Sequence, residues 1–133
     1  MNADKDRLHW GLSEAIIGAA MTVLNKLKPG LNEKAYENSL VIELRKRGYV
    51  VEQQRRFDVY YDGVVVDTLI PDIIVDSKVI VDPEVTEAFT ETHTAQMIGY
   101  LAITKLELAL LLNFKFARLG WKRIARSNPR ASA

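Results

Sequence analysis

The first half of the chain carries two helical patterns of apolar residues. Between residues 12 and 27, apolar side chains recur every three or four positions, which predicts an amphipathic helix with Ser13 as its N-cap. The same spacing predicts a second helix over residues 32–47, with Asn32 capping its start. The chain therefore opens with two helices that each bury one face.

After residue 56 the period of the pattern changes to two, as in strands with one buried face. Asp62-Gly63 is typical of a hairpin turn, and Asp76-Ser77 predicts a second turn. The three expected strands cover residues 57–61, 69–75 and 79–85, and residues 64–66 could return from the first turn. Because short turns join them, we expect an antiparallel meander.

The last third of the chain predicts a helix over residues 90–103 and a buried strand over residues 106–114. A strand reached through a helix pairs in parallel, by a right-handed crossover. The predicted fold class is α/β: an αβββαβ core with a mixed four-stranded sheet flanked by helices, and an extra N-terminal helix. Residues 1–126 would form this one domain, and the small and polar residues 127–133 predict a flexible tail.

Composition narrows the class of protein. The 133 residues are 48% hydrophobic and 26% charged, as in an ordinary globular domain. The absence of cysteine excludes disulfides, thiolate zinc sites and a cysteine nucleophile, and it fits a reducing cytoplasm. The apolar runs are too short to span a membrane, and the first ten residues lack the apolar region of a secretion signal. We therefore expect a cytoplasmic protein with no membrane segment.

The net charge is only +1, but the charges are unevenly distributed along the chain. Residues 62–91 contain eight acidic side chains and one basic one, whereas the chain after Glu107 contains six basic side chains and no acidic one. An acidic middle could hold cations, and a basic end could contact phosphates. The alternative is an ordinary solvated surface.

Three carboxylates of the central strands are predicted to converge. Alternate side chains of a strand share a face, so Asp72 would lie on one strand across the hairpin from Asp82, with Glu84 one step further along. Like charges placed this way repel, and a divalent cation would offset the repulsion. Glu33, expected on the apolar face of the second helix, favours metal binding, since a buried carboxylate needs a partner. The alternative is a face that is simply wet.

Polar groups also share one face of the third predicted helix, where His93, Gln96 and Tyr100 are spaced at i, i+3 and i+7. A single histidine on a helix is more often structural than catalytic. No Ser–His–Asp arrangement, P-loop or EF-hand loop is present in the sequence.

Taken together, these residues resemble the GxxExxY proteins. Gly30, Glu33 and Tyr36 match the three positions that define that group. The resemblance covers roughly residues 12–123 and includes several further segments: Pro71-Asp72, His93, Gln96, Tyr100 and residues 111–114.

GxxExxY proteins are assigned to the PD-(D/E)XK nuclease superfamily, so the resemblance implies a restriction-endonuclease-like fold. It also implies hydrolysis of phosphodiester bonds in nucleic acid with Mg²⁺ or Mn²⁺ as cofactor. Carried over by position, the metal ligands would be Glu33, Asp72 and Asp82. The catalytic residues would be Asp72, Asp82, Glu84 and Gln96, and the supporting residues Tyr36, His93 and Tyr100.

The sequence departs from the family signature at one place. Asp82-Pro83-Glu84 stands where E-x-K is expected, so an anion replaces the lysine that would hold the attacking water and the transition-state charge. Pro83 also removes an N–H from a strand that should be paired on both sides. A site built from carboxylates alone would depend on water acidified by the metal.

Three functions are compatible with these features. The first is a metal-dependent nuclease, impaired by the altered motif, in which Lys115, Lys122 and Arg123 contact the nucleic-acid backbone. The second is an inactive nuclease fold that binds nucleic acid or a protein partner, which Glu84 favours. The third is a structural domain that forms a homodimer through sheet edges or helix packing. We expect the first.

Overall fold

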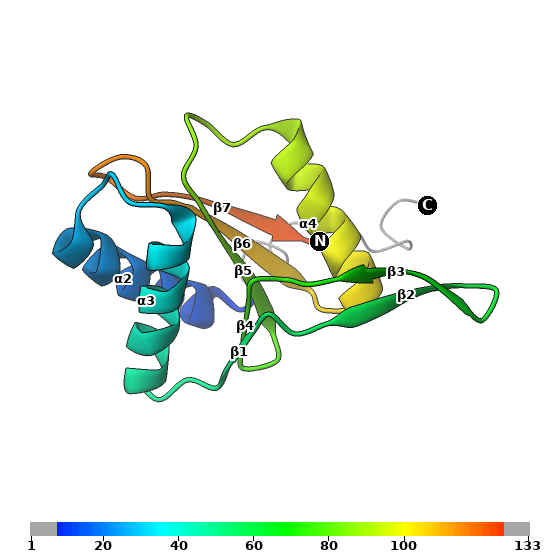
Figure 1. The fold of residues 1–133 in the computed structure, drawn as a ribbon. Helices are drawn as coiled ribbons and strands as arrows, with labels where there is room; N and C mark the ends of the chain where they lie inside the picture. Colours follow the sequence, from blue (N-terminus) through cyan, green and yellow to red (C-terminus); the bar gives the residue numbers. More distant parts are fainter. Residues whose placement is uncertain (1–7, 127–133) are drawn as a thin grey trace.

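A five-stranded mixed sheet is flanked by helices on both faces in the computed structural model, which describes residues 8–126 (Figure 1). The tail predicted at residues 127–133 lies outside the described residues. In chain order the elements are α2 (Trp10–Leu27), α3 (Glu33–Lys46), β1 (Val51–Gln53), β2 (Phe57–Tyr61), β3 (Val64–Leu69), β4 (Ile73–Val75), β5 (Val79–Glu84), α4 (Glu91–Thr104), β6 (Leu108–Asn113) and β7 (Gly120–Ala125).

The strand order of the main sheet is β1-β4-β5-β6-β7. The pair β5–β6 is parallel, as predicted for strands joined through α4, and the other pairs are antiparallel. Helices α2 and α3 cover one face, and α4 covers the other (Figure 1). Each face has its own apolar cluster, so the two sides of the sheet present different surroundings to the side chains of β4 and β5.

The prediction of one strand over residues 69–75 is wrong. Leu69 ends β3, and the next strand, β4, begins only at Ile73. Pro71, which has no N–H to donate, lies in the break between them. Strands β2 and β3 form a separate two-stranded hairpin that runs alongside α4 and projects beyond the main sheet (Figure 1). The predicted meander therefore does not form.

The main sheet has five strands and not the predicted four, because the first predicted strand belongs to the separate hairpin and two other strands escaped the pattern analysis. Strand β1 pairs with β4 but has only three residues, too few to show an alternating pattern. Strand β7 pairs with β6. It was not predicted, because its consecutive cations Lys122 and Arg123 favoured the interpretation of a basic surface segment.

The three predicted helices are confirmed, with a correction at the first cap. Ser13 is not an N-cap: it lies buried inside α2, and its hydroxyl donates to the carbonyl of His9 at 3.0 Å. Asn32 occupies the N-cap position of α3, but its side chain makes no capping hydrogen bond. Helix α4 has a capping box: the Thr90 side chain accepts the His93 N–H, and the His93 side chain accepts the Thr90 N–H.

Candidate active site

The centre of the candidate site is a pair of aspartates on neighbouring strands. Asp72 immediately precedes β4, and Asp82 lies in β5. The register pairs Ile73 with Val81, so one step further along the two aspartates lie opposite each other, as predicted. Ile74 and its paired residue Ile80 pack in the apolar cluster under α4. Because alternate side chains of a strand share a face, Asp72 and Asp82 lie on this same face of the sheet.

This pair is strongly desolvated. Asp82 is only 7% exposed, and its Oδ2 has no hydrogen-bond partner among the described residues. Burial, as the largest cause, together with the nearby carboxyl groups of Glu84 and Asp72, raises the pKa of Asp82 to about 11. Burial also raises the pKa of Asp72, opposed by hydrogen bonds from Asp82 and Gln54. Without a cation the site thus favours a proton on this pair.

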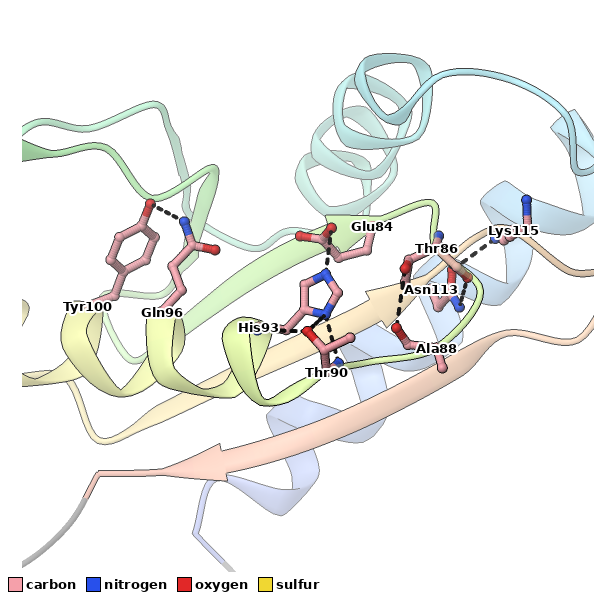
Figure 2. A network of polar contacts seen from close by, with 9 residues as sticks. All are labelled: Glu84, Thr86, Ala88, Thr90, His93, Gln96, Tyr100, Asn113 and Lys115. Atoms are coloured by element: carbon pink, nitrogen blue, oxygen red, sulfur yellow. Dashed lines mark hydrogen bonds and ion pairs between the residues drawn. The ribbon is translucent and has the colours of Figure 1, made fainter.

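Glu84 occupies the place of the expected lysine and lies on the same face as Asp82. Its Oε1 is 3.5 Å from Nε2 of His93 (Figure 2). The other ring nitrogen of His93, Nδ1, accepts the Thr90 N–H at 2.9 Å, so in the neutral ring the proton is on Nε2 and faces Glu84. The capping box of α4 therefore aims His93 at the site.

Pro83 is tolerated because it lies in the part of β5 that no longer pairs with β4. The pairing of β4 with β5 ends at the Ile73–Val81 pair, so Pro83 lies beside β6 alone. The Phe114 N–H donates to the carbonyl of Glu84, which places the polar backbone groups of Glu84 toward β6 and those of Pro83 away from it. The expectation that Pro83 interrupts a strand paired on both sides is therefore wrong.

Helix α3 supplies carboxylates, but the buried one is not the one predicted. Glu33 is exposed in the first turn of α3, whereas Glu37, one turn later, is only 4% exposed. Partial burial raises the pKa of Glu33, and so do Glu84 and Asp72, which shows that Glu33 lies within electrostatic range of the site. Glu33 is thus exposed near Glu84 and Asp72, and its predicted place on the apolar stripe is wrong.

Gln54 joins the buried carboxylate of helix α3 to Asp72, and the sequence analysis did not find this residue. The Nε2 of Gln54 donates to Oε2 of Glu37 at 2.9 Å and to Oδ1 of Asp72 at 3.2 Å. Gln53 also donates to Glu37, at 2.7 Å, but makes no hydrogen bond to Asp72 among the described residues. Glu37 could have been found, because it shares the spacing of Leu40 and the rest of the buried stripe. Gln54 lies in a turn and gives no such signal.

The donor set fits a hard divalent cation, since Mg²⁺ and Mn²⁺ prefer carboxylate oxygens and the unpartnered Oδ2 of Asp82 needs a positive partner. Asp72 and Asp82 are the residues that would hold the ion, with Glu33 and Glu84 in reach of its charge. Within residues 8–126, no group of three or more His, Asp or Glu side chains is placed so that it could hold a metal ion.

Tyr36 belongs to the core and not to the site. It is fully buried and stacks on Phe114, with 4.7 Å between ring centroids. Its hydroxyl donates to the carbonyl of Lys28 at 2.7 Å and accepts the Leu31 N–H at 3.2 Å. Tyr36 therefore fixes the turn between α2 and α3, in which Gly30 adopts a φ of 114° that few other residues tolerate.

Gln96 and Tyr100 lie one turn apart on α4, and Nε2 of Gln96 donates to the Tyr100 hydroxyl at 3.2 Å (Figure 2). Burial raises the pKa of Tyr100, and the negative charges of Asp82 and Asp72 raise it further. Both side chains also line a groove between α4 and the β2–β3 hairpin. Tyr100 therefore lies within electrostatic range of the aspartates, and Gln96 contacts Tyr100; the roles of both residues in the site stay predictions.

The three predicted nucleic-acid contacts do not form one patch. Lys115 pairs with Glu87 at 3.4 Å, and Lys122 donates to Thr94 on α4 at 3.0 Å. Arg123, the next residue of β7, points to the opposite face of the sheet, where it lies over the ring of Trp10 and contacts the carbonyl of Leu8.

Comparison with known proteins identifies the class. The family model of the PD-(D/E)XK nuclease superfamily matches residues 11–124, so the chain belongs to that superfamily. The fold is restriction-endonuclease-like, an α/β fold with a mixed sheet. Among the described residues, no helix is long and apolar enough to cross a membrane.

Two solved structures are similar to this chain. The crystal structure of SSO0001 superposes with a TM-score of 0.59 and 15% identity, over 74% of this chain and 52% of that one. This chain therefore spans about half the length of SSO0001. The alkaline exonuclease LHK-Exo from Laribacter hongkongensis has a TM-score of 0.45 and 11% identity, over 85% of this chain and 79% of that one. A search of curated proteins finds no match to the sequence.

Proposed function

We propose that this protein hydrolyses phosphodiester bonds of nucleic acid with Mg²⁺ or Mn²⁺ held by Asp72 and Asp82. The observation that carries the proposal is the buried pair of aspartates itself. Two carboxyl groups lie opposite each other on neighbouring strands, and one oxygen of the buried Asp82 has no hydrogen-bond partner among the described residues. A bound divalent cation would supply charge neutralisation for the phosphodiester and an acidified water.

The protein's own residues then have distinct tasks. Asp72 and Asp82 bind the cation, and Gln54 holds Asp72 in place through its bond to the buried Glu37. His93 fixes the position of Glu84, whose anionic group replaces the lysine of the signature. Because that lysine normally stabilises developing charge, the reaction is expected to be slower than in a site with the intact motif.

Cleavage of fluorescent single-stranded and duplex DNA and RNA, with Mn²⁺ and with chelator, tests the proposal. We expect Mn²⁺-dependent cleavage that Asp72→Asn abolishes. The matched control is Asp76→Asn at the β4–β5 turn, where the amide oxygen can still accept the Val50 N–H. Cleavage that persists in chelator, or that Asp72→Asn leaves unchanged, would refute the proposal.

A second candidate function is an inactive nuclease fold that binds nucleic acid or a protein partner. The anion Glu84 in the lysine position favours it. Binding of nucleic acid without turnover in Mg²⁺ or Mn²⁺, together with cleavage by Glu84→Lys, would identify this case.

We further propose that the chain belongs to the GxxExxY group within the superfamily. Gly30 and Tyr36 both stabilise the turn between α2 and α3, which explains why two of the three motif positions carry these residue types. A cytoplasmic location, supported by the absence of cysteine, and a homodimer stay predictions.

A further inference from the structure

A groove of about 430 Å³ lies between α4 and the β2–β3 hairpin. Its walls are mainly apolar: Val59 and Leu69 come from the hairpin, and Gly99 and Ile103 come from α4. The polar groups in its lining are Asp67, Gln96 and Tyr100. A neutral group with apolar faces and hydrogen-bonding edges fits this combination better than a charged one.

Tyr100 relates the groove to the aspartate pair, although neither aspartate lines the groove. This side chain lines the groove, and its pKa is raised partly by the negative charges of Asp82 and Asp72, so it lies near both. A molecule with an anionic group at the aspartates and a neutral group attached to it would place the neutral group beside Tyr100.

Gly99 contributes a stretch of groove wall that carries no side chain. It lies inside α4, where glycine costs about 1 kcal/mol relative to alanine. A Cβ atom at this position would meet no other atom within 4 Å, so packing against the protein does not explain the glycine. Its effect is to leave room at the wall of the groove.

We propose that the groove receives an unpaired nucleobase of the strand whose phosphate lies at Asp72 and Asp82; this inference rests on the proposed function. A phosphate would be repelled by Asp67 in the groove, whereas a base is neutral. Its faces can stack on Tyr100 and contact the apolar wall, and Asp67 can accept from an exocyclic amino group. Bases inside a duplex are stacked and paired, so the substrate class is single-stranded nucleic acid or a frayed end.

Substitution of Gly99 tests this inference without touching the aspartates. We would measure the anisotropy of a short fluorescent oligodeoxycytidylate and of a blunt duplex, in Ca²⁺, for the unmodified protein, Gly99→Ala and Gly99→Leu. The matched control is Gly11→Leu in α2, where a Cβ also meets no atom within 4 Å. Ile103→Gln, which makes the wall polar at a partly exposed position, is the second variant if Gly99→Leu does not fold.

We expect the single strand to bind more tightly than the duplex, and Gly99→Leu to weaken single-strand binding about tenfold, with a smaller loss for Gly99→Ala. Gly11→Leu should bind as the unmodified protein does. Equal binding by Gly99→Leu, no preference over duplex, or no binding would overturn the inference. Failure here is separable from failure of the proposed function, because the latter appears as cleavage that is insensitive to Asp72→Asn.

Discussion

The carboxylate of Glu84 lies 3.5 Å from the imidazole of His93, and this contact joins the end of β5 to the first turn of α4. His93 is the only partner of Glu84 that the described residues provide as an ion pair. The contact therefore positions an anion where the superfamily signature has a lysine, next to two further carboxylates.

Glu84→Lys should restore both the charge balance and the missing catalytic group. The ammonium would lie beside Asp82, which lowers the repulsion among the carboxylates and offers a donor to the developing charge. We expect Mn²⁺-dependent cleavage to increase about 10²-fold. Glu84→Gln is the control that removes the charge without adding a cation, and an equal gain in that variant would show that the lysine is not the cause.

The pH dependence of stability should report on Asp82. Its folded-state pKa of about 11 lies above the ordinary value of 3.8, so the metal-free folded protein keeps a proton that the unfolded chain releases. The free energy of unfolding should therefore fall as the pH rises from about 4 toward about 11. Urea unfolding in chelator, at about pH 5 and about pH 9, measures this trend.

Asp82→Asn should remove most of that trend, because the amide has no charge to desolvate. We expect the variant to be more stable than the unmodified protein at about pH 9, by about 1–3 kcal/mol. A pH profile as steep as that of the unmodified protein would show that other groups, such as Glu33, carry the effect.

Gln54 should control metal affinity without binding the metal. Its amide joins Asp72 to Glu37, so Gln54→Ala leaves Asp72 without its positioning donor. We expect Mn²⁺ affinity to fall by about tenfold. Gln53→Ala is the matched control, since among the described residues the Gln53 side chain donates to Glu37 and Asn38 and not to Asp72. An equal loss in that variant would contradict a specific role for Gln54.

Tyr36 should matter for stability and not for metal binding. Tyr36→Phe keeps the stack on Phe114 but leaves the Lys28 carbonyl and the Leu31 N–H without the hydroxyl. We expect a loss of about 1–3 kcal/mol in the free energy of unfolding. An unchanged Mn²⁺ affinity in the folded variant would separate this role from that of the site, and a large drop in affinity would contradict it.

The helices, the crossover and the convergence of Asp72 with Asp82 could be predicted because each leaves a periodic signal. Alternation within β5 and the turn at Ser77 were enough to bring the two aspartates together. Strand β1 could not be found, since three residues with one buried side chain show no period.

Other features depend on tertiary context that no local pattern encodes. The break at residues 70–72 is an exception, because Pro71 marks it locally, but the apolar residues on both sides of Pro71 read as one strand. The positions of Lys122 and Arg123 on opposite faces follow from the pairing of β7 with β6, which the sequence did not predict. Gln54 acts through a turn with a φ of 58°, so its contact with Asp72 needs the folded chain.

The most direct test of a cation site at the aspartate pair is calorimetric titration of Mn²⁺ into the metal-free protein and into Asp72→Ala. We expect saturable binding to the unmodified protein and none to the variant, at a pH where both are folded. Absence of binding to the unmodified protein, or the same binding to Asp72→Ala, would contradict it.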